Sequence, residues 1–276
     1  EIAGVGRLVL QERFAVLRDQ WLHHRRHRTP ARAVLFLLDE AVQRDGGVRG
    51  LDLHLDRIER ATQELFGTAI DRERVREYLR HAVAGSSAPL ALRVNIFSRG
   101  LNRDRPSQPA PPDILVTVAP ASRASIEPLR LKSFRYTREL PQIKHVGTFP
   151  LFHYRRTAQQ AGYDDAVFVD DSGCISEGSI WNIGFWDGAG VIWPEAPQLA
   201  GVSMQLLQAG LARAKIASSV RKISLSDVGR FQSAFFTNAG TAVRLIAAID
   251  DAALVIDRSV EARLQECHDN NLLQPL

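Results

Sequence analysis

Lysine is rare in this sequence, and one lysine has neighbours suited to chemistry. Among 35 lysines and arginines, the only lysines are Lys132, Lys144, Lys215 and Lys222. Lys132 alternates with apolar residues, as on the solvent face of a strand, and the last two have the polar neighbours of surface lysines. Lys144 instead follows an extended segment and precedes Gly147, which lets another group approach the backbone closely. A partly desolvated amine there could attack a carbonyl group and form a Schiff base.

Lys144 begins an ordered series of motifs. Glu177 and Gly178, three further residues and then Asn182 form a Glu-Gly-x-x-x-Asn motif. The other members are Ala-Gly-Tyr-Asp-Asp-Ala at 161–166, an apolar strand at 167–170, an Asp-Ser-Gly turn at 171–173 and Ala-Gly-Val-Ser at 200–203. The series resembles the class IV aminotransferases, the fold-type IV pyridoxal-phosphate enzymes that include branched-chain and D-amino-acid aminotransferases and aminodeoxychorismate lyase.

The resemblance implies pyridoxal 5'-phosphate as the cofactor and gives two residues central roles. Lys144 would be the Schiff-base lysine and, once released, the general base that moves the α-proton. Glu177 would hydrogen-bond the pyridine nitrogen and keep it protonated, because a carboxylate favours a neighbouring cation. The cofactor would then act as the electron sink of the reaction.

Other residues would hold the phosphate of that cofactor. Arg57 ends a His-Leu-Asp-Arg sequence that resembles the family's phosphate-binding motif, and a guanidinium suits bidentate phosphate recognition. Val202 and Ser203 stand at an expected helix N-terminus, where backbone N–H groups and the helix dipole favour an anion. The family's last phosphate contact is a threonine in a turn, which aligns with Ala239 or, after a two-residue shift, with Thr241.

Several departures leave the reaction open. Phe149 stands five residues beyond the lysine, where branched-chain enzymes have a tyrosine, while Lys144-His145 and the sequence at 198–202 are closer to the lyase branch. We expect an aminotransferase that moves an amino group between a small amino acid and a 2-oxo acid. The alternative is a lyase-like β-elimination on the same Lys144.

A second alternative is a cofactor-poor homologue that acts as a binding protein. The family's Tyr/Phe-Gly-Asp-Gly-x-Phe-Glu sequence is not recognisable in the region of about residues 20–45, and the phosphate turn is altered. Taken alone, Arg57 could equally be a solvent-facing helix arginine paired with Asp56 or Glu59.

The composition argues against a nucleic-acid-binding, metal-binding or membrane-spanning protein. With 45% hydrophobic and 24% charged residues, the chain has an ordinary globular composition. Its net charge of +4 comes from basic residues interspersed with acidic ones, so we expect no nucleic-acid partner. Cys174 and Cys267 lack metal-type spacing, which predicts no metal site and reduced thiols in a cytoplasmic protein. No apolar run approaches the roughly 18 residues of a membrane span.

The elements that must position these residues form an α+β (mixed α/β) pattern. We expect a smaller N-terminal domain over residues 1–120 and a larger domain over 121–276 that carries Lys144. The family builds its sites near a subunit interface, so the resemblance also implies a homodimer. Periodicity predicts helices at 52–66, with Asp52 as N-cap, 71–84, 150–161, 203–214 and from 259, and strands at 48–51, 90–97, 114–118, 129–136, 166–170, 175–177, 179–186, 191–193, 234–237 and 243–249.

Overall fold

The computed structural model describes residues 37–44, 46–122 and 125–276. Most of the region of about residues 20–45 lies outside the described residues. Residues 34–276 group as one unit by their contacts, so the predicted division near residue 120 stays a prediction. The described elements are β1 (Leu37–Arg44), β2 (Gly47–Arg49), α2 (Leu51–Phe66), α3 (Arg72–Val83), β3 (Leu90–Phe97), β4 (Asp113–Pro120), β5 (Leu129–Arg135), α4 (Phe149–Gln160), β6 (Asp165–Val169), β7 (Ile175–Gly178), β8 (Asn182–Trp186), β9 (Gly190–Pro194), α5 (Val202–Arg213), β10 (Ala217–Arg221), η2 (Leu225–Arg230), β11 (Ser233–Asn238), β12 (Thr241–Ile249), β13 (Ala252–Ala253), α6 (Arg258–Asp269) and β14 (Leu273–Pro275).

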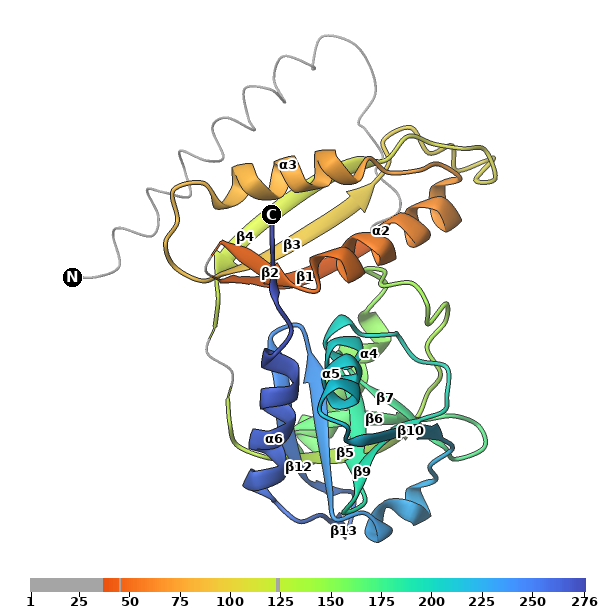
Figure 1. Ribbon diagram of the computed structural model, residues 1–276. Coiled ribbons are helices and arrows are strands. Elements are labelled where there is room, and N and C mark those ends of the chain that lie inside the picture. Colours follow the sequence, from red (N-terminus) through yellow and green to blue (C-terminus); the bar gives the residue numbers. More distant parts are fainter. Residues whose placement is uncertain (1–36, 45, 123–124) are drawn as a thin grey trace, which may run out of the picture. The chain divides into compact units, whose positions relative to one another are not determined.

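The first sheet is antiparallel and includes a strand from the far end of the chain. Its order is β14-β2-β1-β3-β4, and β14 pairs with β2 so that Leu273 lies opposite Arg49. Helices α2 and α3 pack against this sheet (Figure 1). Buried Leu55, Ile58 and Phe66 of α2 share their core with apolar residues of β3. The apolar side chains that recur at helical spacing therefore form one face of α2, and this face packs on the sheet.

The start of α2 differs from the expected cap. Gly50 occupies the N-cap position with φ 69°, in the left-handed region, and no side chain caps the helix. A side chain at Gly50 would also meet Val202, 2.8 Å from the added Cβ. Asp52 lies in the first turn instead, where its carboxylate contacts Arg76 at 2.6 Å. The Asp52 cap prediction was wrong because the close approach of α2 to α5 requires glycine.

The second sheet is mixed and curls around its own core. Its order is β10-β9-β8-β11-β12-β5-β6-β7, with β13 paired to β12. Val167, Ile183 and Phe236 belong to the inner core. Side chains on the other face of the sheet pack against helices. Phe168 packs against α4, and Phe235 packs against α5 and α6. Strands covered on both faces have the continuous apolar sequences seen in β6, β8 and β9.

The expected strand at 179–186 is shorter in the structure. It begins only at Asn182, because residues 179–181 form a turn in which the Ser179 hydroxyl and the Trp181 indole both donate to buried Asp165. The elements β10, η2, β13 and β14 were not predicted. They are short or exposed, so they lack a long apolar period.

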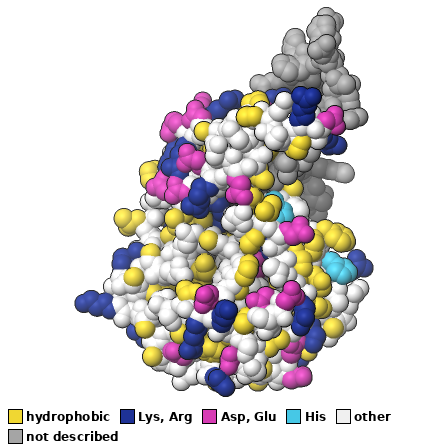
Figure 2. Space-filling model, turned by 90° about the vertical axis from the view of Figure 1, so that its right-hand side faces the viewer, with side chains coloured by type: hydrophobic (Ala, Val, Ile, Leu, Met, Phe, Trp, Pro, Cys, Tyr) yellow, Lys and Arg dark blue, Asp and Glu magenta, His cyan; other side chains and the backbone are white. Residues whose placement is uncertain are grey.

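Charged side chains are mixed over the surface that faces the viewer in Figure 2. Lysine and arginine side chains lie between aspartate and glutamate side chains there. The positive net charge of +4 is therefore not gathered into one patch on this face. No helix among the described residues is long and apolar enough to span a membrane.

Candidate functional site

A pocket of about 630 Å³, including space open to solvent, collects side chains from six parts of the chain. These parts are α2, the segment 138–148 after β5, the start of α4, the end of β7 with the turn to β8, the loop into α5, and the turn between β11 and β12. The lining residues are His54, Arg57, Arg138, Lys144, His145, Thr148, Leu151, Glu177, Ser179, Ile180, Trp181, Asn182, Leu199, Gly201, Val202, Ser203, Thr237, Asn238 and Ala239.

Lys144 reaches the pocket from an irregular segment. It follows Ile143, which is 1% exposed and anchors the segment in the core of the first sheet. Lys144 and Glu177 line the same pocket, and the charge of Lys144 opposes the rise that burial causes in the pKa of Glu177. Neither Lys132, which pairs with Asp250 at 2.8 Å, nor the exposed lysines at 215 and 222 line the pocket.

Glu177 is a buried carboxylate, only 4% exposed, at the end of β7. Its Oε2 accepts a hydrogen bond from the Leu199 backbone N–H at 3.2 Å. Its Oε1 lies 4.0 Å from Arg138 Nη1 and accepts no hydrogen bond from any residue that the structure describes. Burial raises the pKa of Glu177, while Arg138, the Leu199 N–H and Lys144 oppose that rise. Glu177 thus has one anchored oxygen and one oxygen left for a ligand.

The Glu-Gly-x-x-x-Asn motif has a direct structural reason. A Cβ on Gly178 would lie 2.1 Å from the Trp181 ring, so the ring can close over this position only if residue 178 is glycine. Asn182 donates to Gln198 Oε1 at 2.9 Å and to the Leu199 carbonyl at 2.7 Å. The motif therefore fixes both Glu177 and the loop that leads into α5.

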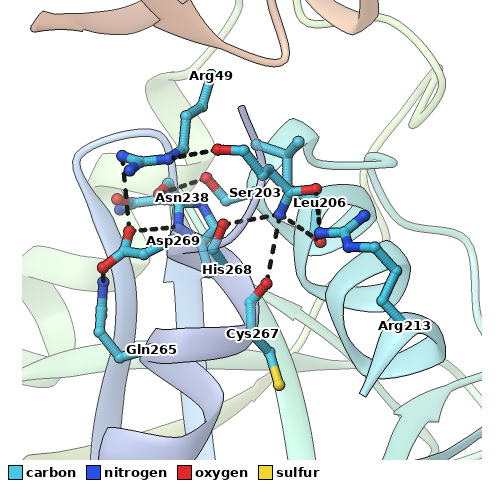
Figure 3. Close-up of polar contacts among 10 residues, drawn as sticks. Arg49, Ser203, Leu206, Arg213, Asn238, Gln265, Cys267, His268 and Asp269 are labelled. Carbon is cyan, nitrogen blue, oxygen red and sulfur yellow. Dashed lines mark hydrogen bonds and ion pairs between the residues drawn. The ribbon is translucent and has the colours of Figure 1, made fainter. Parts of the chain in front are cut away.

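The N-terminus of α5 forms one wall of the pocket. Gly201 is its N-cap and no side chain caps the helix, so the first backbone N–H groups of α5 have no partner within the helix. Val202 and Ser203 line the pocket here. The Ser203 hydroxyl donates to the Asn238 carbonyl at 2.8 Å, which ties α5 to the turn between β11 and β12 (Figure 3). This wall has the features of an anion site.

Arg57 enters the pocket from α2. It is 7% exposed, and its guanidinium lies 3.5 Å from the Ala200 carbonyl and 3.5 Å from His54 Nδ1. Asp56 and Glu59, the partners considered for a solvent-facing Arg57, pair with Arg72 instead. Arg57 is therefore a buried cation that faces the N-terminal end of α5.

The C-terminal part of the chain holds α2 and α5 together. Arg49, just before α2, donates to the Asn271 carbonyl at 3.0 Å and lies 3.6 Å from Asp269 (Figure 3). The Asn271 amide donates to the Leu206 carbonyl of α5 at 3.0 Å, and Arg213 of α5 donates to Asn271 Oδ1 at 2.8 Å. The helices that carry Arg57 and Ser203 are thus joined by residues close to β14.

The turn between β11 and β12 brings Ala239, not Thr241, to the pocket. The backbone N–H of Thr241 donates to Asn238 Oδ1 at 2.9 Å, and Thr241 does not line the pocket. Thr237 lines it, and its buried hydroxyl oxygen has no hydrogen-bond partner among the described residues. The structure therefore offers a threonine two residues before the position considered in the sequence.

Six of the seven predicted site residues meet in this pocket, and their roles stay predictions: Arg57, Lys144, Glu177, Val202, Ser203 and Ala239. Phe149 is 80% exposed and does not line it. Sequence reasoning missed Arg138 and Thr237. Thr237 could have been found, since it begins the aligned turn, whereas the polar neighbours of Arg138, Thr137 and Glu139, are those of a surface arginine.

The residues present fit an anionic pyridine cofactor. Among the described residues that line the pocket, Arg57, Arg138 and Lys144 bring three cationic side chains against one carboxylate, Glu177. A phosphate suits a buried guanidinium beside a helix N-terminus. The unpartnered Oε1 of Glu177 suits a protonated ring nitrogen. Among the described residues, no group of three or more His, Cys, Asp and Glu could hold a metal ion.

Residues 39–249 match the model of the family described as amino-transferase class IV. The chain belongs to this family. No curated protein matches the chain in sequence. The fold resembles that of a protein from Legionella pneumophila described as a 4-amino-4-deoxychorismate lyase (16% identity over 86% of this chain and 91% of that one, TM-score 0.74). It also resembles the branched-chain aminotransferase of Thermoproteus uzoniensis with norvaline (16% identity, 84% of each chain, TM-score 0.76).

A third structure, a hypothetical aminotransferase from Mycobacterium tuberculosis in its pyridoxal-phosphate-bound form, shares 19% identity over 85% of this chain and 87% of that one, with a TM-score of 0.72. These likenesses confirm the expected α+β fold of the fold-type IV enzymes. The family match confirms the cofactor expected for the class IV aminotransferases, pyridoxal 5'-phosphate.

Proposed function

We propose that this class IV enzyme is an aminotransferase that moves an amino group between a small amino acid and a 2-oxo acid. One observation carries the proposal. Lys144, Glu177 and Arg57 come from three separate parts of the chain, yet all line one pocket, and a buried oxygen of Glu177 is left without a hydrogen-bond partner among the described residues. A cofactor-poor binding protein would not need this combination of groups.

The side chains divide the work as follows. Pyridoxal 5'-phosphate, when bound, supplies an electron sink for negative charge at the α-carbon of the amino acid. Lys144 Nζ would hold the cofactor and, once released from it, would take up or return the proton of the α-carbon. Glu177 Oε1 keeps a proton on the ring nitrogen by stabilising its positive charge. Arg57 and the N–H groups of Val202 and Ser203 hold the phosphate, with Ala239 beside them at the turn.

A lyase-like β-elimination is the second candidate. His145 lines the pocket next to Lys144, whereas Phe149, at the position of the tyrosine in branched-chain enzymes, faces solvent. Both observations suit the lyase branch, in which Lys144 would serve as acid and base for a substrate that loses a group from its β-carbon.

The test is an absorbance spectrum of the protein with pyridoxal phosphate. Wild type should show a visible band that borohydride fixes covalently, and Lys144→Ala should lack it and lose about 10³-fold in activity. Lys132→Ala, a lysine outside the pocket, is the matched control and should keep the band. A wild type that stays colourless after dialysis would rule out this function.

A second measurement separates the two reactions. An amino acid added alone should convert the bound cofactor to its pyridoxamine form in an aminotransferase, because the amino group stays with the cofactor until a 2-oxo acid arrives. A lyase should release its product and return to the original spectrum. Retention of the pyridoxal band with release of pyruvate or a similar product would favour the lyase.

We also propose a homodimer in the cytoplasm. Large apolar side chains are exposed beside the pocket: Leu140, Val146, Phe149, Phe152 and Ile180 are 41–80% exposed. A second copy that covered them would bury apolar surface next to the site. The free thiols of Cys174 and Cys267 support a reducing compartment.

A further inference from the structure

Arg138 is a buried arginine that has no role in the proposed function so far. It is 8% exposed and lies between β5 and Lys144. One end of its guanidinium, Nη2, donates to the Ile143 carbonyl at 3.3 Å. Its Nε makes no hydrogen bond with any described residue. A buried guanidinium with so few partners is costly unless a nearby negative charge compensates it.

Glu177 supplies that charge. Arg138 Nη1 lies 4.0 Å from Glu177 Oε1, and the two side chains are only 7% and 5% exposed. This distance is too long for a hydrogen bond. The attraction between the charges nevertheless stays strong, because little water screens a buried pair. Arg138 therefore compensates the carboxylate without occupying the oxygen that faces it.

The second contact of Arg138 links Glu177 to the reactive lysine. The Ile143 carbonyl belongs to the residue directly before Lys144, so one guanidinium touches the backbone that carries the amine and faces the carboxylate. The Leu199 N–H holds the other oxygen of Glu177 at 3.2 Å. Together these contacts fix where Oε1 stands relative to Lys144.

We propose that Arg138 is a positioning residue that keeps Glu177 charged and oriented, so that Oε1 stays available to the protonated ring nitrogen of the cofactor. The inference rests on the proposed function, since it gives Arg138 a task only if Glu177 meets that nitrogen. A bond of Arg138 to Oε1 itself would compete with the cofactor. The 4.0 Å separation provides charge without that competition.

The first test uses the cofactor-free protein and a double-mutant cycle. Arg138→Met should lower the Tm by roughly 5–10 °C, because it leaves Glu177 as an uncompensated buried charge. The same change in a Glu177→Gln background should cost less than half as much. Arg135→Met, which removes an exposed arginine three residues earlier, should show no coupling to Glu177.

The double-mutant cycle remains informative when a variant does not fold. If Arg138→Met does not fold while Arg138→Met with Glu177→Gln does, the coupling is established. If the Tm falls equally in both backgrounds, or both variants fail to fold, Arg138 acts only through the Ile143 carbonyl and the inference is wrong. Arg138→Lys keeps the positive charge and should retain most of the wild-type Tm.

The second test measures the Kd of pyridoxal phosphate near neutral pH. Arg138→Met should weaken binding about tenfold near neutral pH in the wild-type background and change it little beside Glu177→Gln. Arg138→Lys should restore most of the affinity, which a merely structural arginine would not. Loss of the visible band in wild type would refute the proposed function, whereas an intact band without coupling would refute only the role of Arg138.

Discussion

The two oxygens of Glu177 have different surroundings, and this difference has a consequence for stability. Oε2 accepts from the Leu199 N–H, while Oε1 accepts nothing from the described residues. Desolvation is the largest influence on this group and raises its pKa above the ordinary value of 4.5. Burial thus makes the charged form of Glu177 costly, and Arg138, the Leu199 N–H and Lys144 offset only part of that cost.

The expected result is a pH-dependent penalty in the cofactor-free enzyme. The folded-state pKa of Glu177 exceeds its unfolded value, so its contribution to stability is fully present below pH 4.5 and is lost as pH rises through the folded-state pKa. Glu177→Gln removes this pH-dependent contribution to stability. The Tm difference between Glu177→Gln and wild type should therefore grow in favour of the variant as pH rises above 4.5.

Thermal melts from pH 4 to 8 would measure this difference. Asp187→Asn is a suitable control, because backbone hydrogen bonds lower the pKa of this exposed carboxylate below 3.8, so its removal should give a Tm difference that is nearly constant between pH 4 and 8. A Tm difference for Glu177→Gln that is constant with pH would contradict the assignment of a raised pKa.

At the scale of elements, β7 and the turn after it depend on one glycine. The Trp181 ring lies where a side chain at residue 178 would stand, and the Trp181 indole is held by Asp165 at 3.0 Å. Gly178→Ala should therefore cost about 1–3 kcal/mol of unfolding free energy through overpacking. It should also displace Glu177 and weaken cofactor binding.

Urea unfolding would measure the first effect. Gly229→Ala is the matched control, because a Cβ there meets nothing within 4 Å and should leave stability nearly unchanged. Equal stability of the Gly178 and Gly229 variants would mean that the ring can move away at little cost.

Hydrogen bonds between β14 and α2 also support the helix that carries Arg57. The Gln274 amide donates to Asp52 Oδ2 at 2.7 Å, and the Asp52 N–H donates to Gln274 Oε1 at 3.0 Å. Gln274→Ala removes both hydrogen bonds at the first turn of the helix that carries Arg57. We expect a loss of about 1–2 kcal/mol and faster amide exchange at the start of α2.

Hydrogen-exchange mass spectrometry would locate the effect. Leu272→Ala, which truncates a side chain that is 85% exposed, should leave α2 protected as in wild type. Unchanged exchange in Gln274→Ala would show that backbone pairing between β14 and β2 holds α2 by itself.

At the scale of the whole molecule, the exposed apolar residues beside the pocket predict a dimer. The mass in sedimentation velocity should be twice the chain mass of 30.7 kDa. Phe149→Asp should shift it toward the monomer, because a buried unpaired charge is costly at an interface. Ile126→Asp, a similar change at a residue that is 69% exposed, is the control. A wild-type mass equal to that of one chain would contradict the proposed dimer.

Sequence reasoning reached the parts of the site that lie in short local motifs. Lys144 stood out among four lysines, and Glu177 came with a glycine and an asparagine at fixed spacing, because these neighbours have to shape the same turn. Arg57 came with its helical motif. In each case the residues that support one another are close in sequence, so the pattern was visible.

The rest depends on tertiary contacts that leave no local pattern. Arg138 lies between the polar residues Thr137 and Glu139, as a surface arginine would, and only the structure shows that it is buried beside Glu177. The three residues of β14 carry too little periodicity to predict a strand. The glycine cap of α2 was missed because its cause is Val202, which lies far away in the chain.

The pairing of β14 with β2 has a consequence for synthesis of the protein. Asp52 and Gln274 lie 222 residues apart in sequence. At about 5–20 residues per second, roughly 10–45 s pass on the ribosome between them. During that interval the edge of β2 has no partner from β14, and the helix that carries Arg57 lacks its hydrogen bonds to Gln274. The first turn of α2 therefore gains these two hydrogen bonds only after residues 273–275 have left the ribosomal tunnel.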